Sequence, residues 1–545
     1  MARSQLAYGV SLAAIAVMML GATAQAQNVA AARAGGGFQG GGGFQGSGGF
    51  HGGGGGRHRS GGGGNSDPPA VTDPGIRSGT PGAGQPLTGL SQDELNYFTD
   101  SQTTFNDVDT PATGLGPGFN LDSCGGCHVF PAAGGSSPRT NNPQIAVATA
   151  MGATNVVPPF VTANGPIREA RFVLNPDGTP DGGVHDLFSI AGRTDAQGCD
   201  LAQPNFAAQL AANNVIFRIP PPMFGAGLVE NVSDGSLQAA FNAQSQLKGS
   251  LGISGAFNAS GNTGNITRFG WKAQNISMLM FAGEAYNAEQ GVTNELFPNE
   301  RNNPDASCQL NPLPEDATPL TPPTTPGASQ ASGFNSDIVL FAAFARMLAP
   351  PTPAIPLNIP STASSSAAAP ASTASTTPAP TASSTPVAVA SVLPAAGGAS
   401  TTAPAAAATP AASQATSVNA GLQAFMNVGC AACHIVSQTT GNSALGPAAT
   451  NVTFNPFSDF ATHNMGSGLA DRVTQGNANG FMFRSAPLWG IGQRAFFIHD
   501  GRTSDLLQAI LQHASAGSEA NTVVNQFQML STTDQQNILA FLRNL

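Results

Sequence analysis

Apolar residues recur at helical spacing in several stretches of the chain. The first stretch opens with a capping box, Ser91 and Glu94, and places Leu95 and Phe98 on one face. Two later stretches share this spacing: Val418, Leu422, Phe425 and Met426, and then Ile538, Leu539, Leu542 and Leu545 behind a capping box at 533–536. Such helices bury one face, so we expect the last helix to pack against the one at 418–426. The pattern predicts a mostly α fold with irregular loops.

The amino terminus carries a different apolar pattern. Arg3 precedes a largely apolar run, 10–20, that is too short to span a bilayer, and residues 24–26 have the small-x-small form of a signal cleavage site. A membrane anchor is the alternative, but the run ends in small residues and lacks a basic stop. We therefore predict a signal peptide at 1–26, export to the periplasm or out of the cell, and a mature chain without a transmembrane anchor.

Two low-complexity segments divide the rest of the chain. Residues 27–82 are rich in glycine, whose backbone entropy no core offsets, and they predict a disordered leader. Residues 350–417 are almost entirely Ala, Pro, Ser and Thr, lie within a stretch (347–458) that has no charged side chain, and predict a linker. Two folded domains are then expected, at 83–349 and 418–545, each long enough for its own core.

The charge of the chain is low and acidic. Charged residues make up 9% of the sequence, with 20 Lys and Arg against 30 Asp and Glu. Only two of the basic residues are lysines, Lys248 and Lys272. A nucleic-acid binder needs a cationic surface that neutralises phosphates, so this composition excludes that class. Neutral or basic partners are expected instead.

Four of the six cysteines fall into two C-x-x-C-H motifs, one in each expected domain. The motifs are Cys124, Cys127 and His128, and Cys430, Cys433 and His434. In this pattern the two thiols attach to one porphyrin and the adjacent histidine ligates its iron. Zinc sites and redox disulfides also use C-x-x-C, but a zinc site would leave both histidines unexplained. The motifs predict two covalently bound haem c groups. Each motif follows a predicted helix, and a cytochrome c domain begins with this order of helix and motif.

The second iron has two main candidates for its sixth ligand. His513 follows Ile510 by three residues and continues the apolar face of a predicted helix, so its imidazole is expected to point inward. Methionine ligation is also common in electron-transfer cytochromes, which makes Met465 the alternative. We expect His128 and His434 to be the proximal ligands and favour His513 for the remaining position.

Several further motifs follow one another along both expected domains. They are LGPGFN at 115–120, RFGWKA at 268–273, NELFP at 294–298, FRSAPLWG at 483–490, FIHDGR at 497–502 and AILQH at 509–513. In this order they resemble the dihaem oxidoreductase family, often labelled peroxidase or thiol oxidoreductase and related to the bacterial dihaem cytochrome c peroxidases. The similarity covers nearly all of 83–349 and 418–545.

The resemblance implies two cytochrome c-like domains, the first enlarged by insertions. It implies that the C-terminal haem is six-coordinate and relays electrons, and that the N-terminal haem has a reactive distal face. The partners would be a small periplasmic electron-transfer protein and a small oxidant such as hydrogen peroxide or dioxygen. A histidine at position 513 implies bis-histidine ligation and a lower potential than methionine would give. Calcium is a further candidate cofactor.

The distal side of the N-terminal haem has three catalytic candidates. Trp271 and Lys272 precede an apolar helical stretch, 274–286, which we expect to cover this haem. Glu284 on that stretch can shuttle protons to bound peroxide, or it can pair with Lys272 or Arg268. The sequence favours neither role for Glu284.

Two residues of the C-terminal motifs are cofactor-binding candidates. Arg484 can neutralise haem propionates because a guanidinium pairs with carboxylates in a bidentate way, and Arg494 and Arg502 are similar candidates. A solvated surface arginine is the alternative for each. His499, in the motif at 497–502, joins Arg484 in this set.

Cys199 and Cys308 lie outside the haem motifs. They are 109 residues apart in one domain of an exported chain, which predicts a structural disulfide. They lack the C-x-x-C spacing of a redox pair, so we do not assign them to catalysis.

Together these features predict a periplasmic dihaem c-type oxidoreductase of peroxidase type. Electrons would enter at the haem of His434 and pass to the haem of His128. One alternative is an electron-transfer cytochrome without a substrate of its own. Another is a dihaem oxygenase acting on an apolar polymer, which a distant likeness to the dihaem rubber oxygenases suggests.

Overall fold

Helices supply most of the regular structure. The computed structural model describes residues 70–302, 307–318, 335–360 and 411–545. The predicted signal peptide, most of the predicted leader and most of the predicted linker lie outside these residues. All described residues belong to one unit, Asp67–Leu545. We call 70–349 its amino-terminal half and 411–545 its carboxyl-terminal half.

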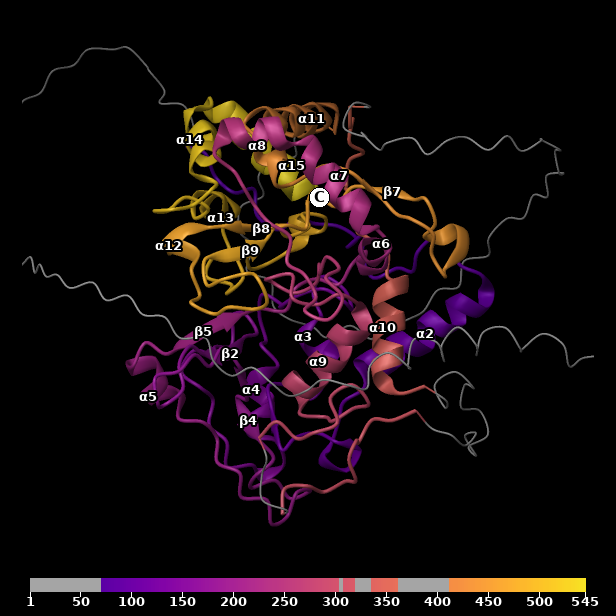
Figure 1. Cartoon of the computed structure of the whole chain (residues 1–545), viewed down its shortest axis with the longest axis vertical. Helices are drawn as coiled ribbons and strands as arrows, with labels where there is room; N and C mark the ends of the chain where they lie inside the picture. The colour runs from indigo at the N-terminus through magenta and orange to yellow at the C-terminus, as the bar shows by residue number, and fades with distance from the viewer. Residues whose placement is uncertain (1–69, 303–306, 319–334, 361–410) are drawn as a thin grey trace, which may run out of the picture. The chain divides into compact units, whose positions relative to one another are not determined.

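Three longer helices form the centre of the amino-terminal half: α2 (Gln92–Asn106), α9 (Met278–Gln290) and α10 (Asp337–Met347). α10 packs against both α2 and α9 (Figure 1). Buried aromatic rings fill the contact, with Phe105 beside Phe344 and Tyr286 edge-on to Phe341. The shorter helices of this half are α3 (Cys124–Cys127), α4 (Gln144–Val147), α5 (Phe206–Ala211), α6 (Ala226–Glu230), α7 (Asp234–Ala243) and α8 (Ser245–Leu251).

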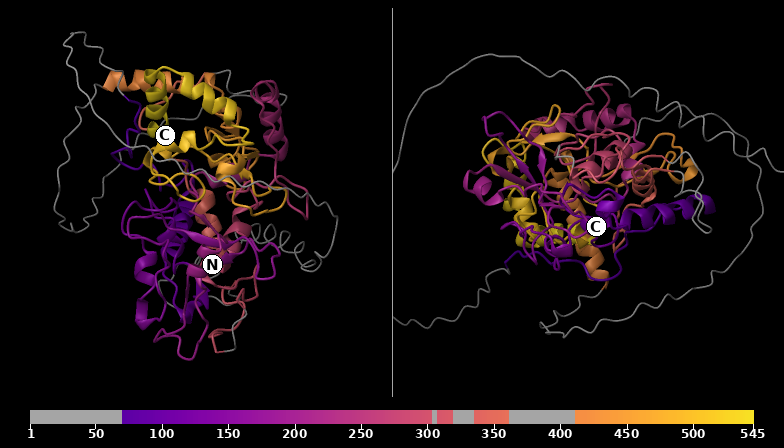
Figure 2. Two further views of the ribbon diagram at one scale, coloured as in Figure 1. Left: turned by 90° about the vertical axis from the view of Figure 1, so that its left-hand side faces the viewer. Right: turned by 90° about the horizontal axis from the view of Figure 1, so that it is seen from below.

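The carboxyl-terminal half is built on α11 (Ala411–Asn427) and α15 (Thr532–Asn544). These two helices lie against each other, as Figure 2 also shows from other directions. The other helices of this half are α12 (Gly466–Leu469), α13 (Leu506–Leu511) and α14 (Asn521–Met529). Buried Phe425 of α11 and Phe541 of α15 meet edge-on at 5.3 Å between ring centroids, which confirms the expected packing of these helices.

The strands are short and antiparallel. In the three-stranded sheet, β2 (Glu169–Phe172) lies between β3 (Val184–His185) and β5 (Val215–Arg218), with Glu169 opposite Arg218. The two-stranded pairs are β1 (Gly118–Phe119) with β4 (Phe188–Ser189), β6 (Gln438–Thr439) with β7 (Thr453–Phe454), and β8 (Thr462–Asn464) with β9 (Met482–Arg484). Helices with a few small sheets agree with the mostly α prediction, while the two cytochrome c-like domains stay a prediction.

Helix starts follow the caps that the side chains provide. The Ser91–Glu94 capping box is present at the start of α2, as predicted. α15 begins before the predicted box, because the Ser531 hydroxyl accepts a hydrogen bond from the Asp534 backbone N–H. α9 begins at Met278 behind the Ser277 cap and runs to Gln290, later than the predicted stretch at both ends.

Residues from the predicted leader and the predicted linker also pack against the carboxyl-terminal half. The carboxylate of Asp73, a residue assigned to the leader, binds the Arg543 guanidinium of α15 and accepts from the backbone N–H of Leu506 at 2.7 Å. The Asn544 side chain bonds the backbone of Ile355. In the described residues no helix is both long enough and apolar enough to cross a membrane.

The contact between α11 and α15 depends on a glycine. A Cβ atom at Gly421 would lie 1.9 Å from the backbone oxygen of Asn537 and 2.8 Å from Cβ of Phe541. The helix backbones can therefore approach only because position 421 has no side chain.

We expect Gly421→Ala to lower the free energy of unfolding by about 1–3 kcal/mol, because the extra methyl group forces the two helices apart. Urea unfolding followed by circular dichroism measures the change. Gly249→Ala is the matched control, since a Cβ in that helical position of α8 meets nothing within 4 Å; its stability should stay the same or rise by up to about 1 kcal/mol. Equal losses in both variants would contradict the close-approach explanation.

Candidate functional site

Two large cavities each contain one C-x-x-C-H motif. The first, about 1400 Å³, is lined by Cys124, Cys127 and His128. The second, about 1460 Å³, is lined by Cys430, Cys433 and His434. The first pair of thiols lies on α3. In the second pair, Cys430 begins a 3₁₀ turn (Cys430–Ala432) and Cys433 follows it directly. Both cavities have mainly apolar walls, as a porphyrin requires.

The four motif thiols are free cysteines. None of them forms a disulfide in the structure. Burial raises the pKa of Cys430 to about 12 and raises the pKa of Cys124 further. Their placement on cavity walls fits attachment to a ligand inside each cavity.

Three histidines have the same orientation toward a cavity. Nδ1 of His128 donates to the Gly135 carbonyl at 3.0 Å, Nδ1 of His434 to the Phe457 carbonyl at 2.8 Å, and Nδ1 of His513 to the Ala509 carbonyl at 2.7 Å. Burial lowers the pKa of His128 and of His434 to about 4, so both rings are neutral. With the proton fixed on Nδ1, Nε2 is the nitrogen that can ligate a metal.

The second cavity contains both histidines of the predicted bis-histidine site, since His513 lines it together with His434. Asp505 caps α13, and the helix ends at Leu511, two residues before His513. Met465 lines the same cavity and stays the alternative. Two other histidines line this cavity. Both ring nitrogens of His463 bond carboxylates, those of Asp459 and Glu519, and the His499 ring stacks on Phe483 with 4.2 Å between ring centroids.

The first cavity has a different lining. Among its described lining residues His128 is the one histidine, and carboxyl groups face the space beside Trp271. Glu284 of α9 is one of these and accepts a hydrogen bond from the Asn275 side chain. It pairs with neither Lys272 nor Arg268, whose guanidinium contacts Asp234.

A pair of carboxyl groups in the first cavity was missed in the sequence. Glu169 of β2 and Glu289 of α9 share a hydrogen bond, and both line the cavity. Burial and the neighbouring Glu169 charge raise the pKa of Glu289 well above its usual value. Burial alone would raise the pKa of Glu169 too, but Arg171 beside it brings that pKa down to about 2. The pair therefore keeps a shared proton to a pH well above the usual carboxyl range.

The end of α9 positions Glu289. Its side chain accepts from the Asn120 amide at 2.8 Å, and its backbone oxygen accepts from the Asn120 backbone N–H. Gly291 caps the helix with φ +74°, and a Cβ there would lie 2.4 Å from the oxygens of Gly116 and Gly118. One signal was present in the sequence: a glutamate just before a helix-ending glycine opposes the helix dipole and needs another reason to be there.

Lys272 lies outside both cavity linings. Its ammonium is fully buried, 3.0 Å from Asp471, and it also donates to the backbone oxygens of Asn479 and Met482. Burial lowers its pKa to about 8. Lys272 thus joins the two halves of the unit from outside both cavity linings, and its role as a catalytic candidate stays a prediction.

Trp271 lines both cavities, and so does Arg484. The indole N–H of Trp271 donates to the Ile219 backbone oxygen at 2.9 Å, which fixes the ring. The backbone N–H of Arg484 donates to the Trp271 oxygen, so the two residues are tied to each other. These side chains connect the two cavities that contain the C-x-x-C-H motifs.

Two buried arginines indicate whether an anionic cofactor would fit in the second cavity. Nε of Arg484, and Nε and Nη2 of Arg494, are buried without a hydrogen-bond partner among the described residues, and both side chains line the second cavity. Burial, and for Arg484 the neighbouring Arg494, lowers the pKa of each to about 10, so both stay charged at neutral pH. Haem propionates would satisfy these donors. Arg502 instead pairs with Asp500 at 2.7 Å.

The remaining cofactor and cysteine predictions have these outcomes. Within the described ranges, no group of three or more His, Cys, Asp or Glu could hold a metal ion, so calcium has no assigned position there. Cys199 and Cys308 form a disulfide, and both side chains are buried.

Comparison with known proteins agrees with this geometry. Residues 399–545 match the family described as di-haem oxidoreductase, putative peroxidase. The matched part contains the second C-x-x-C-H motif and His513, and the match supports the family that the sequence motifs indicated. No curated protein and no solved structure matches the chain.

The raised pKa of Glu289 should make stability depend on pH. The folded state binds more protons than the unfolded state above the ordinary value of 4.5, so stability falls as pH rises from there toward the raised pKa. We expect Glu289→Gln, which mimics the protonated form, to reduce this fall in urea unfolding between about pH 5 and 8. Glu284→Gln, on the same helix, is the control and should keep the wild-type slope. A wild-type slope in Glu289→Gln would refute the shared proton.

Proposed function

We propose that this chain is a dihaem c-type oxidoreductase of peroxidase type. The observation that carries the proposal is the difference between the two cavities. One offers two histidines with Nδ1 anchored on backbone carbonyls, and the other offers one such histidine beside a carboxyl pair that holds a proton. An iron with two strong ligands suits electron transfer, while an iron with an open position suits reaction with a small oxidant.

In each cavity, cysteines and histidines would hold the haem, and in the second cavity arginines would neutralise its propionates. Cys124, Cys127 and His128 would hold the first haem, and Cys430, Cys433, His434 and His513 the second. Haem iron supplies the one-electron chemistry and the site at which a peroxide binds. Arg484 and Arg494 would neutralise propionate charge in the second cavity.

Glu289 is the group best placed to move a proton in the first cavity. Its carboxyl is neutral beside ionised Glu169, so it can donate a proton to the departing oxygen of a peroxide and recover one through the pair. Asn120 keeps the carboxyl in place at 2.8 Å. Glu284, in the same lining, is a second carboxyl that can pass protons along the cavity.

Trp271 and Arg484 would mediate electron transfer between the haems, because each lines both cavities. A fixed indole with its N–H bonded at 2.9 Å needs little reorganisation during transfer. We further propose export through the predicted signal peptide, a small periplasmic electron-transfer protein as donor, and hydrogen peroxide or dioxygen as the oxidant.

Electron paramagnetic resonance of the purified ferric protein tests the ligation. We expect one low-spin and one high-spin signal, and conversion of the low-spin signal to high-spin in His513→Ala because the second iron loses a ligand. His185→Ala is the control: His185 pairs with Asp181 and lines neither cavity, so its variant should keep both signals.

The same spectra separate the alternatives. Two low-spin centres that do not respond to peroxide would favour a plain electron-transfer cytochrome. A stable dioxygen complex at the first haem would favour an oxygenase. An unchanged low-spin signal in His513→Ala would exclude His513 as the ligand.

Trp271→Phe should slow the transfer of electrons between the haems by at least tenfold, because phenylalanine is harder to oxidise and lacks the N–H that fixes the ring. Stopped-flow absorption after mixing the half-reduced protein with peroxide measures the rate. Trp489→Phe is the matched control: Trp489 is equally buried, at 7% against 8% exposed, and lines neither cavity. Equal rates in wild type and Trp271→Phe would remove Trp271 from the pathway.

A further inference from the structure

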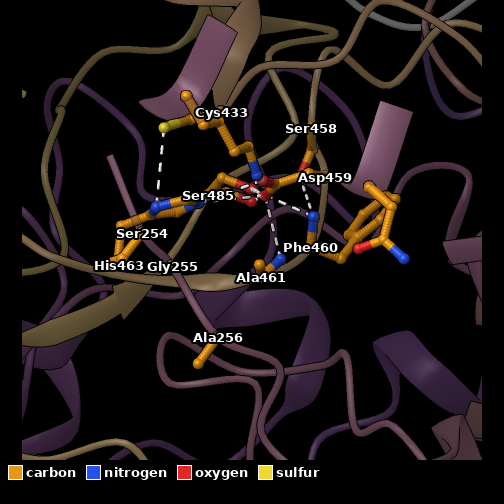
Figure 3. A network of polar contacts seen from close by, with 12 residues as sticks. Ser254, Gly255, Ala256, Cys433, Ser458, Asp459, Phe460, Ala461, His463 and Ser485 are labelled. Atoms are coloured by element: carbon orange, nitrogen blue, oxygen red, sulfur yellow. Dashed lines mark hydrogen bonds and ion pairs between the residues drawn. The ribbon is translucent and has the colours of Figure 1, made fainter. Parts of the chain in front are cut away.

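A buried ionic network lies beside the second haem-attachment motif. At its centre is the carboxylate of Asp459, which is inaccessible to solvent. Its Oδ2 accepts from Lys248 Nζ at 2.7 Å and from His463 Nε2 at 3.1 Å, and its Oδ1 accepts from the Ser485 hydroxyl at 2.5 Å. Figure 3 shows this carboxylate among the residues that bond it. The proposed haem binding, proton transfer and electron transfer use none of these contacts.

The network holds a loop in a backbone conformation that it would not adopt unaided. Phe457 and Phe460, on either side of Asp459, have φ values of +52° and +59°, which are unfavourable for bulky residues. The Asp459 carboxylate accepts from the Ala461 N–H at 3.0 Å, and the Ser458 hydroxyl accepts from the Phe460 N–H at 3.0 Å. These side chains stabilise the loop in its strained form.

The loop in turn orients the proximal histidine. The Phe457 carbonyl accepts the Nδ1 hydrogen bond of His434. The Ser458 and Asp459 backbone N–H groups donate to the Ile435 and Cys433 oxygens, both at 2.9 Å. The loop that Asp459 stabilises therefore holds the Phe457 carbonyl in place to accept the hydrogen bond of His434.

Two cations lie against Asp459, His463 from the same half and Lys248 from the other half of the unit. Lys248 belongs to α8, 211 residues away, and its side chain is 3% exposed. The chain just after α8 contacts the same region: Ser254 and Gly255 donate to Glu519, which is bonded to the second nitrogen of His463. A Cβ at Gly255 would lie 2.5 Å from the His463 ring, so the approach requires glycine.

We propose that Lys248 and Asp459 are positioning residues that set the reduction potential of the second haem through the His434 hydrogen bond, a role that rests on the proposed function. A hydrogen bond from Nδ1 to a carbonyl makes the imidazole a more basic ligand and favours the ferric state. When the loop relaxes, the Phe457 carbonyl moves away, the ligand becomes less basic and the potential rises. The amino-terminal half would thereby tune the electron-relay centre of the carboxyl-terminal half.

The test is potentiometric titration of the low-spin haem in the full haem-loaded chain. Lys248→Met and Asp459→Asn each change one charge, so by charge alone their effects on the potential have opposite signs. The double variant K248M/D459N removes both charges together. We expect it to raise the potential by about 59 mV, a tenfold change in a one-electron equilibrium, because the loop is no longer held.

Asp186→Asn is the matched control. Asp186 is also a buried carboxylate in an ion pair, with Arg301 at 3.1 Å, but it lines neither cavity. Its variant should leave the potential unchanged. Ser458→Ala removes one acceptor of the Phe460 N–H and the hydrogen bond that the hydroxyl donates to the Ser485 carbonyl. It should also raise the potential, and it provides a test if the double variant does not fold.

Two results would overturn the proposal. One is a double variant with the wild-type potential whose single variants shift in opposite directions, because the pair would then act by charge alone. The other is an unchanged potential in Ser458→Ala with the double variant unfolded. Absence of a low-spin haem in the wild type would instead refute the proposed function, so the two failures are distinguishable.

Discussion

Both lysines of the chain are buried, and both bridge its two halves. Lys248 pairs with Asp459 at 2.7 Å and Lys272 pairs with Asp471 at 3.0 Å, and all four side chains are at most 3% exposed. An ion removed from water without its partner is strongly destabilising, so each lysine can be buried only where the opposite aspartate is present. The two pairs therefore fix how the halves meet, and the other features of the site depend on that arrangement.

One consequence is the position of Trp271. Lys272 follows it directly and is held by Asp471, which Arg218 also contacts at 3.0 Å. The ammonium lies over the ring of Phe483, and that ring stacks on His499 in the second cavity. A chain of packed groups thus leads from one cavity wall to the other, and it exists only while the ion pairs hold the two halves together.

The two cavities differ in chemistry although their motifs are alike. In the second, the neutral imidazoles of His434 and His513 would suit an iron with two protein ligands, and the unbonded N–H donors of Arg484 and Arg494 would suit haem propionates. In the first, the Glu169–Glu289 pair keeps a proton because two adjacent carboxylates cannot both ionise in a buried space. Under the proposed function, one fold would hold a relay centre and a reactive centre, with the difference made by the side chains around each C-x-x-C-H motif and not by the motif itself.

Local patterns determined much of this protein from sequence alone. The C-x-x-C-H motifs, the capped α2 and the apolar faces of α11 and α15 depend on residues within a few positions of each other, and His513 was found because helical spacing points it inward. The predicted starts of α9 and α15 were wrong because Ser277 and Ser531 cap these helices at other positions. Only the tertiary structure brought Glu169 to Glu289, Lys248 to Asp459 and Trp271 to both cavities. Those contacts join residues far apart in the chain, and the free energy of burying a charge or sharing a proton exists only after the halves have packed.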